Sequence, residues 1–250
     1  MTLNLDYSSS FNYGYIIVNF TTLLFFINNA YLLNAIIPLS ATSNKHQEWK
    51  WRNIANSLIH SSVTGIGACI SLYMTPEFHE DLISYWTPSA HCLIAFSIGY
   101  FIYDLIDMGL NDRKSKTFEL MAHHTLVISC FFLSLSTYRY TGFTLMALLV
   151  EVNSIFLHIR QLMIIQCWSR QDHLYRLNNT FNLGTFVVFR ILVMGWMTRW
   201  LLQNRDLLSL SAYRLGGLTL GVIMVMNIIL FMRILKSDYQ QCPQELVKVK

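Results

Sequence analysis

The sequence is poor in charged residues. Aspartate, glutamate, lysine and arginine together make up 13% of the 250 residues, whereas hydrophobic residues make up 54%. Because a soluble globular domain has about 25% charged residues, this composition excludes an ordinary soluble protein and predicts a membrane protein. The net charge is only +4, and the basic residues lie in short loops instead of one patch. Nucleic acid is therefore not an expected partner.

The sequence also lacks the spacings of familiar metal and nucleotide sites. Its five cysteines include no C-x-x-C pair, so we expect neither a disulfide framework nor a zinc site. It has no glycine-rich phosphate loop and no G-x-S-x-G elbow. Membrane desaturases need several histidine boxes, and His123-His124 is the only close histidine pair. We predict no metal and no cofactor, and Cys167 and Cys242 remain candidates for S-palmitoylation near membrane ends.

Seven long apolar stretches account for most of the chain. Each is close to the roughly 20 residues that a helix needs to cross a bilayer. The first stretch has no basic residue ahead of it and is too long for a signal peptide, so we expect it to be retained. The sequence thus predicts an all-α, polytopic membrane protein with about seven transmembrane helices. The stretches are residues 11–39, 53–74, 89–107, 118–136, 142–165, 181–202 and 215–235, and Asn178-Asn179 is the expected turn before the sixth.

Loop charges predict the orientation of these helices. If the N-terminus lies outside, the cytosolic segments hold twelve basic residues and the outer segments hold three. This is the bias of the positive-inside rule, so we expect an outer N-terminus and a cytosolic C-terminus. The sequon Asn178-Asn179-Thr180 then lies in the cytosol, where it cannot be glycosylated.

Polar residues inside the apolar stretches are the candidate functional residues. His123 and His124 are adjacent in the fourth stretch, and ionisable groups at membrane depth mark functional sites by default. Tyr100, Asp104 and Asp107 share one face of the third helix, because residues three or four apart are neighbours on a helix. We expect these side chains to face the interior of the bundle.

The fifth helix carries a similar face. Glu151, Ser154 and His158 are spaced so that they lie on one side of it. Together with residues of four other helices, they predict a polar layer around a lipid cavity in the cytosolic half of the membrane, with Glu151 just beyond that layer. With Glu151 included, the candidate residues of this cavity are His60, Tyr100, Asp104, His123, His124, Glu151, Ser154, His158 and Arg190.

Several polar residues also have simpler interpretations. Asp107 and Arg160 fit interfacial side chains that reach back to water. His60 fits a core histidine bonded to a backbone carbonyl, and Arg190 fits an ion-pair partner of Glu151. The two adjacent histidines point about 100° apart on a helix, so one can face the cavity while the other makes a structural bond.

Five motifs occur in an order that is more specific than the histidine pair alone. They are Trp49-Lys-Trp-Arg-Asn-Ile-Ala-Asn-Ser-Leu-Ile-His60, Gly99-Tyr-Phe-Ile-Tyr-Asp104, Ala122-His-His-Thr125, Leu148-Leu-Val-Glu-Val-Asn-Ser-Ile-Phe-Leu-His-Ile-Arg160 and Gln171-Asp-His-Leu-Tyr-Arg-Leu-Asn178. Together they resemble the TLC-domain family. The resemblance implies a TLC-type helical bundle or barrel with a lipid-sized cavity. It places an N-terminal transmembrane helix and loop at 1–44, a TLC domain of six helices at 45–240 and a cytosolic tail at 241–250.

Within this family, the sequence resembles most the small TLC-domain proteins that regulate plasma-membrane phospholipid composition and fluidity. The resemblance implies that the protein limits polyunsaturated, fluidising phospholipids. The predicted cavity, with a polar layer and apolar walls, suits the binding or handling of a lipid in the bundle, and we favour a role other than that of an enzyme. The implied partners are membrane phospholipids or fatty acyl chains. The implied location is the plasma membrane, with the endoplasmic reticulum as the alternative.

The family also includes the ceramide synthases, and this resemblance implies the alternative function of an acyltransferase that uses acyl-CoA. Their site combines a histidine pair with a later His-Asp-x-x-Asp pattern. His123 and His124 match the pair, and Glu151 takes the place of the first aspartate, so these three would be the catalytic residues. Val150 and Ser154 replace the histidine and the second aspartate of the pattern, which removes two groups that assist a general base. A seven-helix receptor or transporter agrees with the sequence only in helix number.

Overall fold

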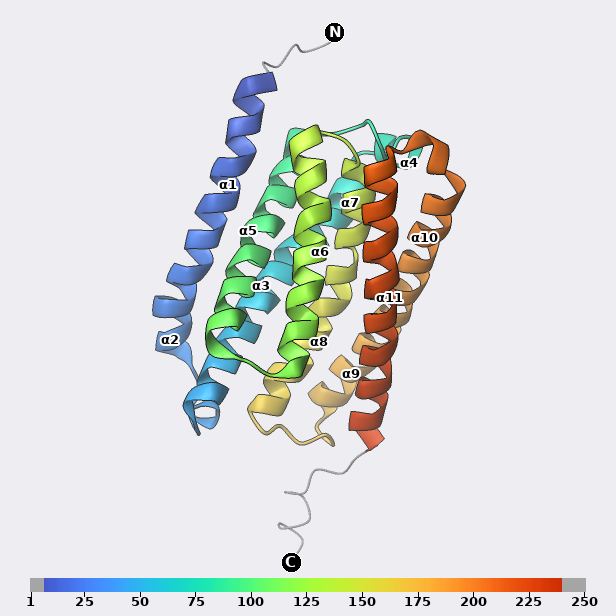
Figure 1. Cartoon of the computed structure of the whole chain (residues 1–250). Helices are drawn as coiled ribbons and strands as arrows, with labels where there is room; N and C mark the ends of the chain where they lie inside the picture. Colours follow the sequence, from blue (N-terminus) through green and yellow to red (C-terminus); the bar gives the residue numbers. More distant parts are fainter. Residues whose placement is uncertain (1–6, 240–250) are drawn as a thin grey trace, which may run out of the picture.

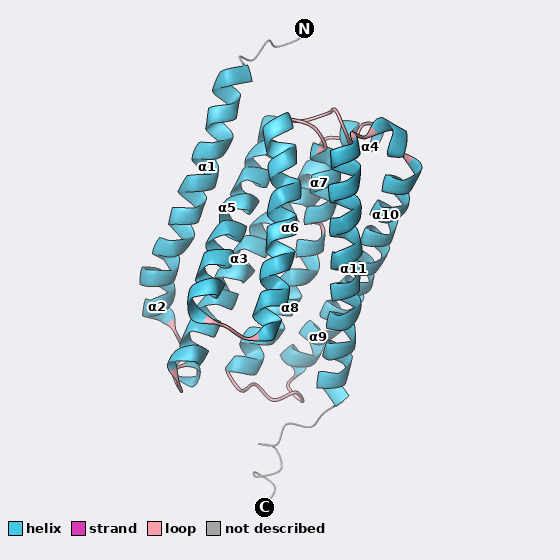
Figure 2. Cartoon of the chain, in the orientation of Figure 1, coloured by secondary structure: helices cyan, strands magenta, loops and turns pink. Residues whose placement is uncertain are grey.

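The computed structural model describes the backbone of residues 7–239 and the side chains of residues 13–237 apart from that of residue 116. Every regular element within these residues is helical, and short loops join the helices (Figure 2). Seven helical spans are long and apolar enough to cross a membrane, which confirms the prediction of an all-α membrane protein. The spans are Tyr13–Ile36, Lys45–Met74, Pro88–Asn111, Thr117–Thr137, Thr141–Ile165, His173–Gln203 and Leu210–Ser237.

Four long helices are continuous, and the other spans are built from shorter pieces. The continuous ones are α3 (Lys45–Met74), α5 (Pro88–Asn111), α6 (Ser115–Thr137) and α11 (Leu210–Tyr239). The first span joins α1 (Tyr7–Ile27) to α2 (Leu33–Ile36) through the π-helical segment Asn28–Leu32. The fifth comprises α7 (Thr141–Leu148) and α8 (Val150–Ile165), and the sixth joins α9 (His173–Thr185) to α10 (Val193–Gln203) through the π-helical segment Phe186–Leu192. Short turns complete the set: α4 (Glu77–Glu80) and the 3-10 segments Leu39–Ala41 and Arg205–Leu207.

Local sequence explains where two of the long helices begin. At the start of α3, the side-chain oxygen of Asn44 accepts a hydrogen bond of 2.9 Å from the backbone N–H of Gln47. At the start of α5, the Thr87 hydroxyl accepts one of 3.2 Å from the N–H of Ala90. Asparagine and threonine are favoured at such N-caps. Pro88 then fills the first helical position, where its missing N–H costs no helical hydrogen bond.

The expected turn at Asn178-Asn179 is wrong. Both residues lie inside α9, which begins at His173 instead of near residue 181. The side-chain amide of Asn178 donates a 3.0 Å hydrogen bond to the carbonyl oxygen of Phe156 on α8. A side chain that could have formed a turn instead hydrogen-bonds to the backbone of a neighbouring helix, as amides commonly do between membrane helices.

Two glycines set the distance between neighbouring helices. The α1 helix lies at the edge of the bundle and packs on α5 (Figure 1). A Cβ atom at Gly99 of α5 would lie 2.6 Å from the carbonyl oxygen of Val18 on α1. A Cβ atom at Gly65 of α3 would lie 2.8 Å from the backbone nitrogen of Val152 on α8. Only glycine permits backbones to approach this closely.

The connections gather at two opposite ends of the bundle (Figure 1). The loops at 37–44, 112–114 and 166–172 lie at one end, which we call the basic end because Lys45, Arg113, Lys114 and Arg170 are close to it. The loops at 75–87, 138–140 and 204–209 lie at the other end. Between them is a core of large buried side chains that includes Ile94, Ile98, Tyr103, Leu145 and Leu148.

Candidate functional site

The α3 helix presents a polar stripe to the interior of the bundle. Trp49, Asn53, Ser57 and Ser61 follow one another at intervals of four residues, so they lie on one side of the helix. All four donate hydrogen bonds, three of them to side chains of α5 or α8, and the fourth residue, Ser57, accepts one from α5. None of the four was among the predicted site residues. Their regular spacing within an apolar span is the signal that could have identified them.

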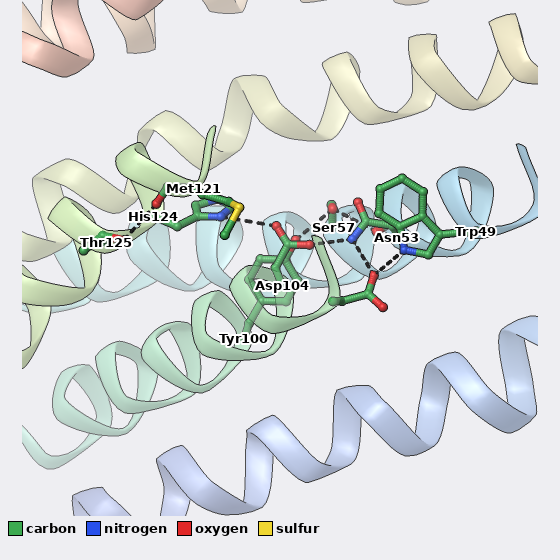
Figure 3. Close-up of polar contacts among 9 residues, drawn as sticks. Trp49, Asn53, Ser57, Tyr100, Asp104, Met121, His124 and Thr125 are labelled. Atoms are coloured by element: carbon green, nitrogen blue, oxygen red, sulfur yellow. Dashed lines mark hydrogen bonds and ion pairs between the residues drawn. The ribbon is translucent and has the colours of Figure 1, made fainter. Parts of the chain in front are cut away.

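The stripe satisfies two buried carboxylates of α5. The side-chain amide of Asn53 donates to Asp104 at 2.6 Å and to Asp107 at 3.0 Å, and the indole N–H of Trp49 donates to Asp107 at 2.8 Å (Figure 3). Asp107 is 4% exposed. The prediction of an interfacial side chain reaching for water is therefore wrong for Asp107, because α3 supplies the donors that water would otherwise provide.

The second histidine of the pair joins this network. His124 Nδ1 lies 3.4 Å from a carboxylate oxygen of Asp104, and both side chains are buried (Figure 3). The contact becomes an ion pair when the imidazole is protonated. The His124 ring also packs against Phe101, with 5.0 Å between ring centroids. His124 is therefore held between α5 and α6 by a carboxylate and an aromatic ring.

Tyr100 and His60 continue the network farther from the basic end. The Tyr100 hydroxyl donates a 2.8 Å hydrogen bond to the hydroxyl of Ser57, and the Tyr100 ring stacks on His60 with 3.9 Å between centroids. His60 Nε2 lies 3.0 Å from the hydroxyl oxygen of Ser97. The predicted partner of His60, a backbone carbonyl, is thus replaced by a side-chain hydroxyl and an aromatic face.

The polar residues predicted on one face of the fifth span do not share a partner. Glu151 accepts a 2.6 Å hydrogen bond from Ser61 of α3, and Ser154 accepts one of 2.7 Å from Arg190. His158 makes no hydrogen bond or ion pair within the part of the chain that the structure describes. The spacing therefore places these residues on one helix face without bringing them to one partner.

The structure contradicts the simpler interpretations of Arg190 and Arg160. Arg190 donates hydrogen bonds to neutral side chains and makes no contact ion pair with Glu151 among the described residues, so that predicted pair is wrong. Arg160 is 4% exposed and donates to the hydroxyl of Ser237 on α11. The prediction that Arg160 reaches back to water is also wrong, because α11 covers it.

An apolar chamber lies beside this network. It has a volume of about 90 Å³ and is enclosed by α5, α6, α7, α8, α10 and α11. Its polar groups include His123 and Glu151, whereas Phe101, Phe131 and Phe143 contribute aromatic walls. The structure therefore separates the histidine pair: His123 faces the chamber, and His124 faces Asp104.

A wider groove adjoins the chamber between α6 and α11. Its volume is about 550 Å³, which lies within the roughly 300–1,000 Å³ of small-molecule sites. His123 and Ile223 line both spaces, so they stand where the groove meets the chamber. Arg190 and Asn227 line the groove near this junction, and Arg233 of α11 lines it closer to the basic end. Together the spaces provide an apolar compartment with a polar entrance.

Comparison with known proteins agrees with this architecture. Residues 50–236 match the family described as the TLC domain. The TLC domain-containing protein 2 of Danio rerio is 44% identical over 209 residues, which are 84% of this chain and 84% of that protein. The human TLC domain-containing protein 1 is 33% identical over 213 residues, or 85% of this chain and 84% of that protein. Because the match covers most of this helical bundle, the chain belongs to the TLC-domain family.

Proposed function

We propose that this protein limits the polyunsaturated, fluidising phospholipids of its membrane by binding a lipid acyl chain inside the helical bundle. The observation that carries the proposal is that the groove and the apolar chamber adjoin each other and share His123 and Ile223 as lining residues. Alkyl and aromatic walls favour a hydrocarbon chain, because burying apolar surface is the main favourable term in such binding. The polar side chains at the entrance suit the polar end of the same lipid.

We assign the basic end of the bundle to the cytosol and the protein to the plasma membrane, with the endoplasmic reticulum as the alternative. The excess of lysine and arginine at that end supports the orientation. A glycosylation sequon inserted into the loop at 204–209 is expected to be modified in cells, whereas the same sequon inserted at 166–172 is not. An endoglycosidase-sensitive mobility shift from the second insertion, and none from the first, would invert the topology.

The chamber offers a direct test of lipid binding. Gly216 lines it, and a Cβ atom there would meet only Leu201 side-chain atoms at 3.6 Å or more. Gly216→Leu should therefore fill the chamber without forcing backbones apart. We expect cells that lack the protein to have more unsaturated phospholipids. Wild type should return the lipid profile to normal, whereas Gly216→Leu, at matched expression, should not.

Gly221→Leu is the matched control for this experiment. It makes the same change on the same helix, at a position where a Cβ atom meets nothing within 4 Å and which lies outside the chamber. Gly221→Leu should restore the wild-type profile. If both variants restore it equally, the chamber does not hold the lipid that matters, and the proposal is lost.

The alternative, an acyltransferase of ceramide synthase type using acyl-CoA, is favoured by one observation: His123 and Glu151 line the same chamber. A general base needs both access to its substrate and an orienting partner. Here the histidine with access is His123, and the one beside a carboxylate is His124. This division favours binding over catalysis. Ceramides that fall in the same lipid profiles on loss of the protein, with acyl-CoA-dependent product formed by purified wild type but not by His123→Ala, would favour the enzyme.

A further inference from the structure

The groove between α6 and α11 contains a guanidinium group whose contacts are all neutral. Arg190 donates from Nε to Asn153 at 2.7 Å, from Nη2 to Ser154 at 2.7 Å and from Nη1 to Asn227 at 3.0 Å. Glu151 accepts from Ser61 instead. An arginine side chain keeps its charge in proteins, and a charge at membrane depth is costly unless it meets a partner. The site therefore lacks a contacting anion among the described residues.

The backbone around Arg190 departs from a regular α-helix. Arg190 lies in the π-helical segment Phe186–Leu192. A π-helical turn is wider than an α-helical turn and changes the direction of the side chains that follow it, and such turns often occur at functional sites. Phe186 lies beneath the guanidinium, with 5.6 Å from Arg190 Cζ to the ring centroid. The local distortion and the aromatic ring together hold Arg190 toward the groove.

A buried donor without an acceptor lies beside this arginine. Asn227 of α11 is 2% exposed, and its side-chain oxygen accepts the bond from Arg190. Its side-chain nitrogen has no hydrogen-bond partner among the described residues. A buried donor left without an acceptor is unfavourable. Arg190 and Asn227 thus leave donor capacity at the same wall of the groove, next to His123.

The carboxylate of Glu119 lines the groove but does not pair with Arg190. Glu119 pairs with Arg233 at 3.3 Å, and both side chains are 46% exposed. The two charges of that exposed pair cancel. Arg190 is then the positive charge of the groove that no described carboxylate contacts, and Glu151 acts on it only from beyond ion-pair distance. An anion with two oxygens matches it well, because a guanidinium group binds carboxylates and phosphates through paired N–H donors.

We infer that Arg190 and Asn227 form a subsite for the anionic group of a lipid whose chain passes His123 into the apolar chamber. The anion is a carboxylate or a phosphate, supplied by a free fatty acid or by a phospholipid. The direction of the chain rests on the proposed function, whereas the anion subsite rests on the donors of the groove. The anionic group then lies at the entrance and the hydrocarbon lies beyond it.

The test uses the full-length protein in an uncharged detergent. Three probes carry the same single 18-carbon chain: a fatty acid, the corresponding fatty alcohol, and a phosphatidic acid in its one-chain (lyso) form. Binding is measured directly with radiolabelled probes at alkaline pH, where the acid is ionised. The variants are Arg190→Gln, Arg190→Lys and Asn227→Leu. Arg233→Gln is the matched control, since it removes the same charge from the same groove.

We expect wild type to bind at least one anionic probe roughly tenfold more tightly than the alcohol, as suits a charge-assisted pair of hydrogen bonds. Arg190→Gln should lose this preference and keep its affinity for the alcohol, which also shows that the variant is folded. Arg190→Lys should keep part of the preference, and Asn227→Leu should reduce it. Arg233→Gln should keep it. Preference for the acid alone identifies a carboxylate ligand, and preference for phosphatidic acid alone identifies a phosphate ligand.

Other results overturn the inference in distinguishable ways. Equal binding of all three probes by wild type would remove the anion subsite and leave chain binding intact. An equal loss of preference in Arg233→Gln and Arg190→Gln would replace a specific subsite with general attraction by charge. If wild type binds none of the probes, the anion subsite and the proposed lipid binding both fail.

Discussion

Gly65→Ala is expected to destabilise the bundle by about 1–3 kcal/mol, the usual cost of forcing atoms into a packed interior. The added Cβ atom would lie 2.8 Å from the backbone nitrogen of Val152 and 3.0 Å from the backbone carbon of Glu151. Backbone atoms cannot turn aside as a side chain can, so α3 and α8 must separate. That separation also displaces Glu151 from Ser61 and from the wall of the chamber. Thermal unfolding of the purified protein in detergent measures the effect.

Gly195→Ala is the control for this change. A Cβ atom at Gly195 meets nothing within 4 Å, and alanine favours a helix by roughly 0.5–1 kcal/mol over glycine. Gly195→Ala should therefore melt at or slightly above the wild-type temperature. If Gly65→Ala unfolds at the same temperature as Gly195→Ala, the packing of α3 against α8 does not depend on the close approach at Gly65.

Asp104→Ala is expected to have a comparable effect through hydrogen bonding instead of packing. The carboxylate accepts a bond from Asn53 at 2.6 Å and lies 3.4 Å from His124. Its removal leaves buried polar atoms short of a partner, each at a cost of about 1–3 kcal/mol. Asn53 keeps its bond to Asp107, so the change removes one of its two hydrogen bonds. It also removes the electrostatic contact of His124, whose Nδ1 makes no hydrogen bond within the described residues. A lower unfolding temperature is the expected result, with Asp104→Asn intermediate because it keeps one acceptor oxygen.

Glu119→Ala is the matched change for Asp104→Ala. It also removes a carboxylate from a membrane span and breaks a contact with a basic side chain, but both partners are 46% exposed. Exposed pairs contribute about 0–1 kcal/mol, so this variant should unfold close to wild type. Equal destabilisation by the two changes would show that burial of the Asp104 network adds nothing to stability.

The number of spans and the faces of two helices were predictable because they depend on local properties. An apolar run of about 20 residues becomes a membrane-length helix whatever surrounds it. Likewise, the spacing of Tyr100, Asp104 and Asp107 places them on one side of α5 through the geometry of a helix alone. The structure buries all three side chains. The polar stripe on α3 follows the same rule, because its residues are spaced four apart in the sequence.

The partner of each polar group was not predictable, because it depends on how neighbouring helices are rotated and how closely they approach. Asp107 could have faced water, and only the position of Trp49 and Asn53 on α3 makes it a buried acceptor. Arg190 carries the right charge for Glu151, yet the π-helical segment directs it to Asn153, Ser154 and Asn227.

The adjacent histidines show the same division between local and tertiary control. The positions of His123 and His124 in the sequence are enough to place two imidazoles in one membrane span and to point them in different directions. The tertiary structure decided which of them meets a carboxylate and which faces a cavity, since Asp104 lies on α5 and the chamber is enclosed by six helices. Helix geometry is set by residues a few positions apart, whereas cavities and polar partners are set by contacts between segments that the chain brings together only when it folds.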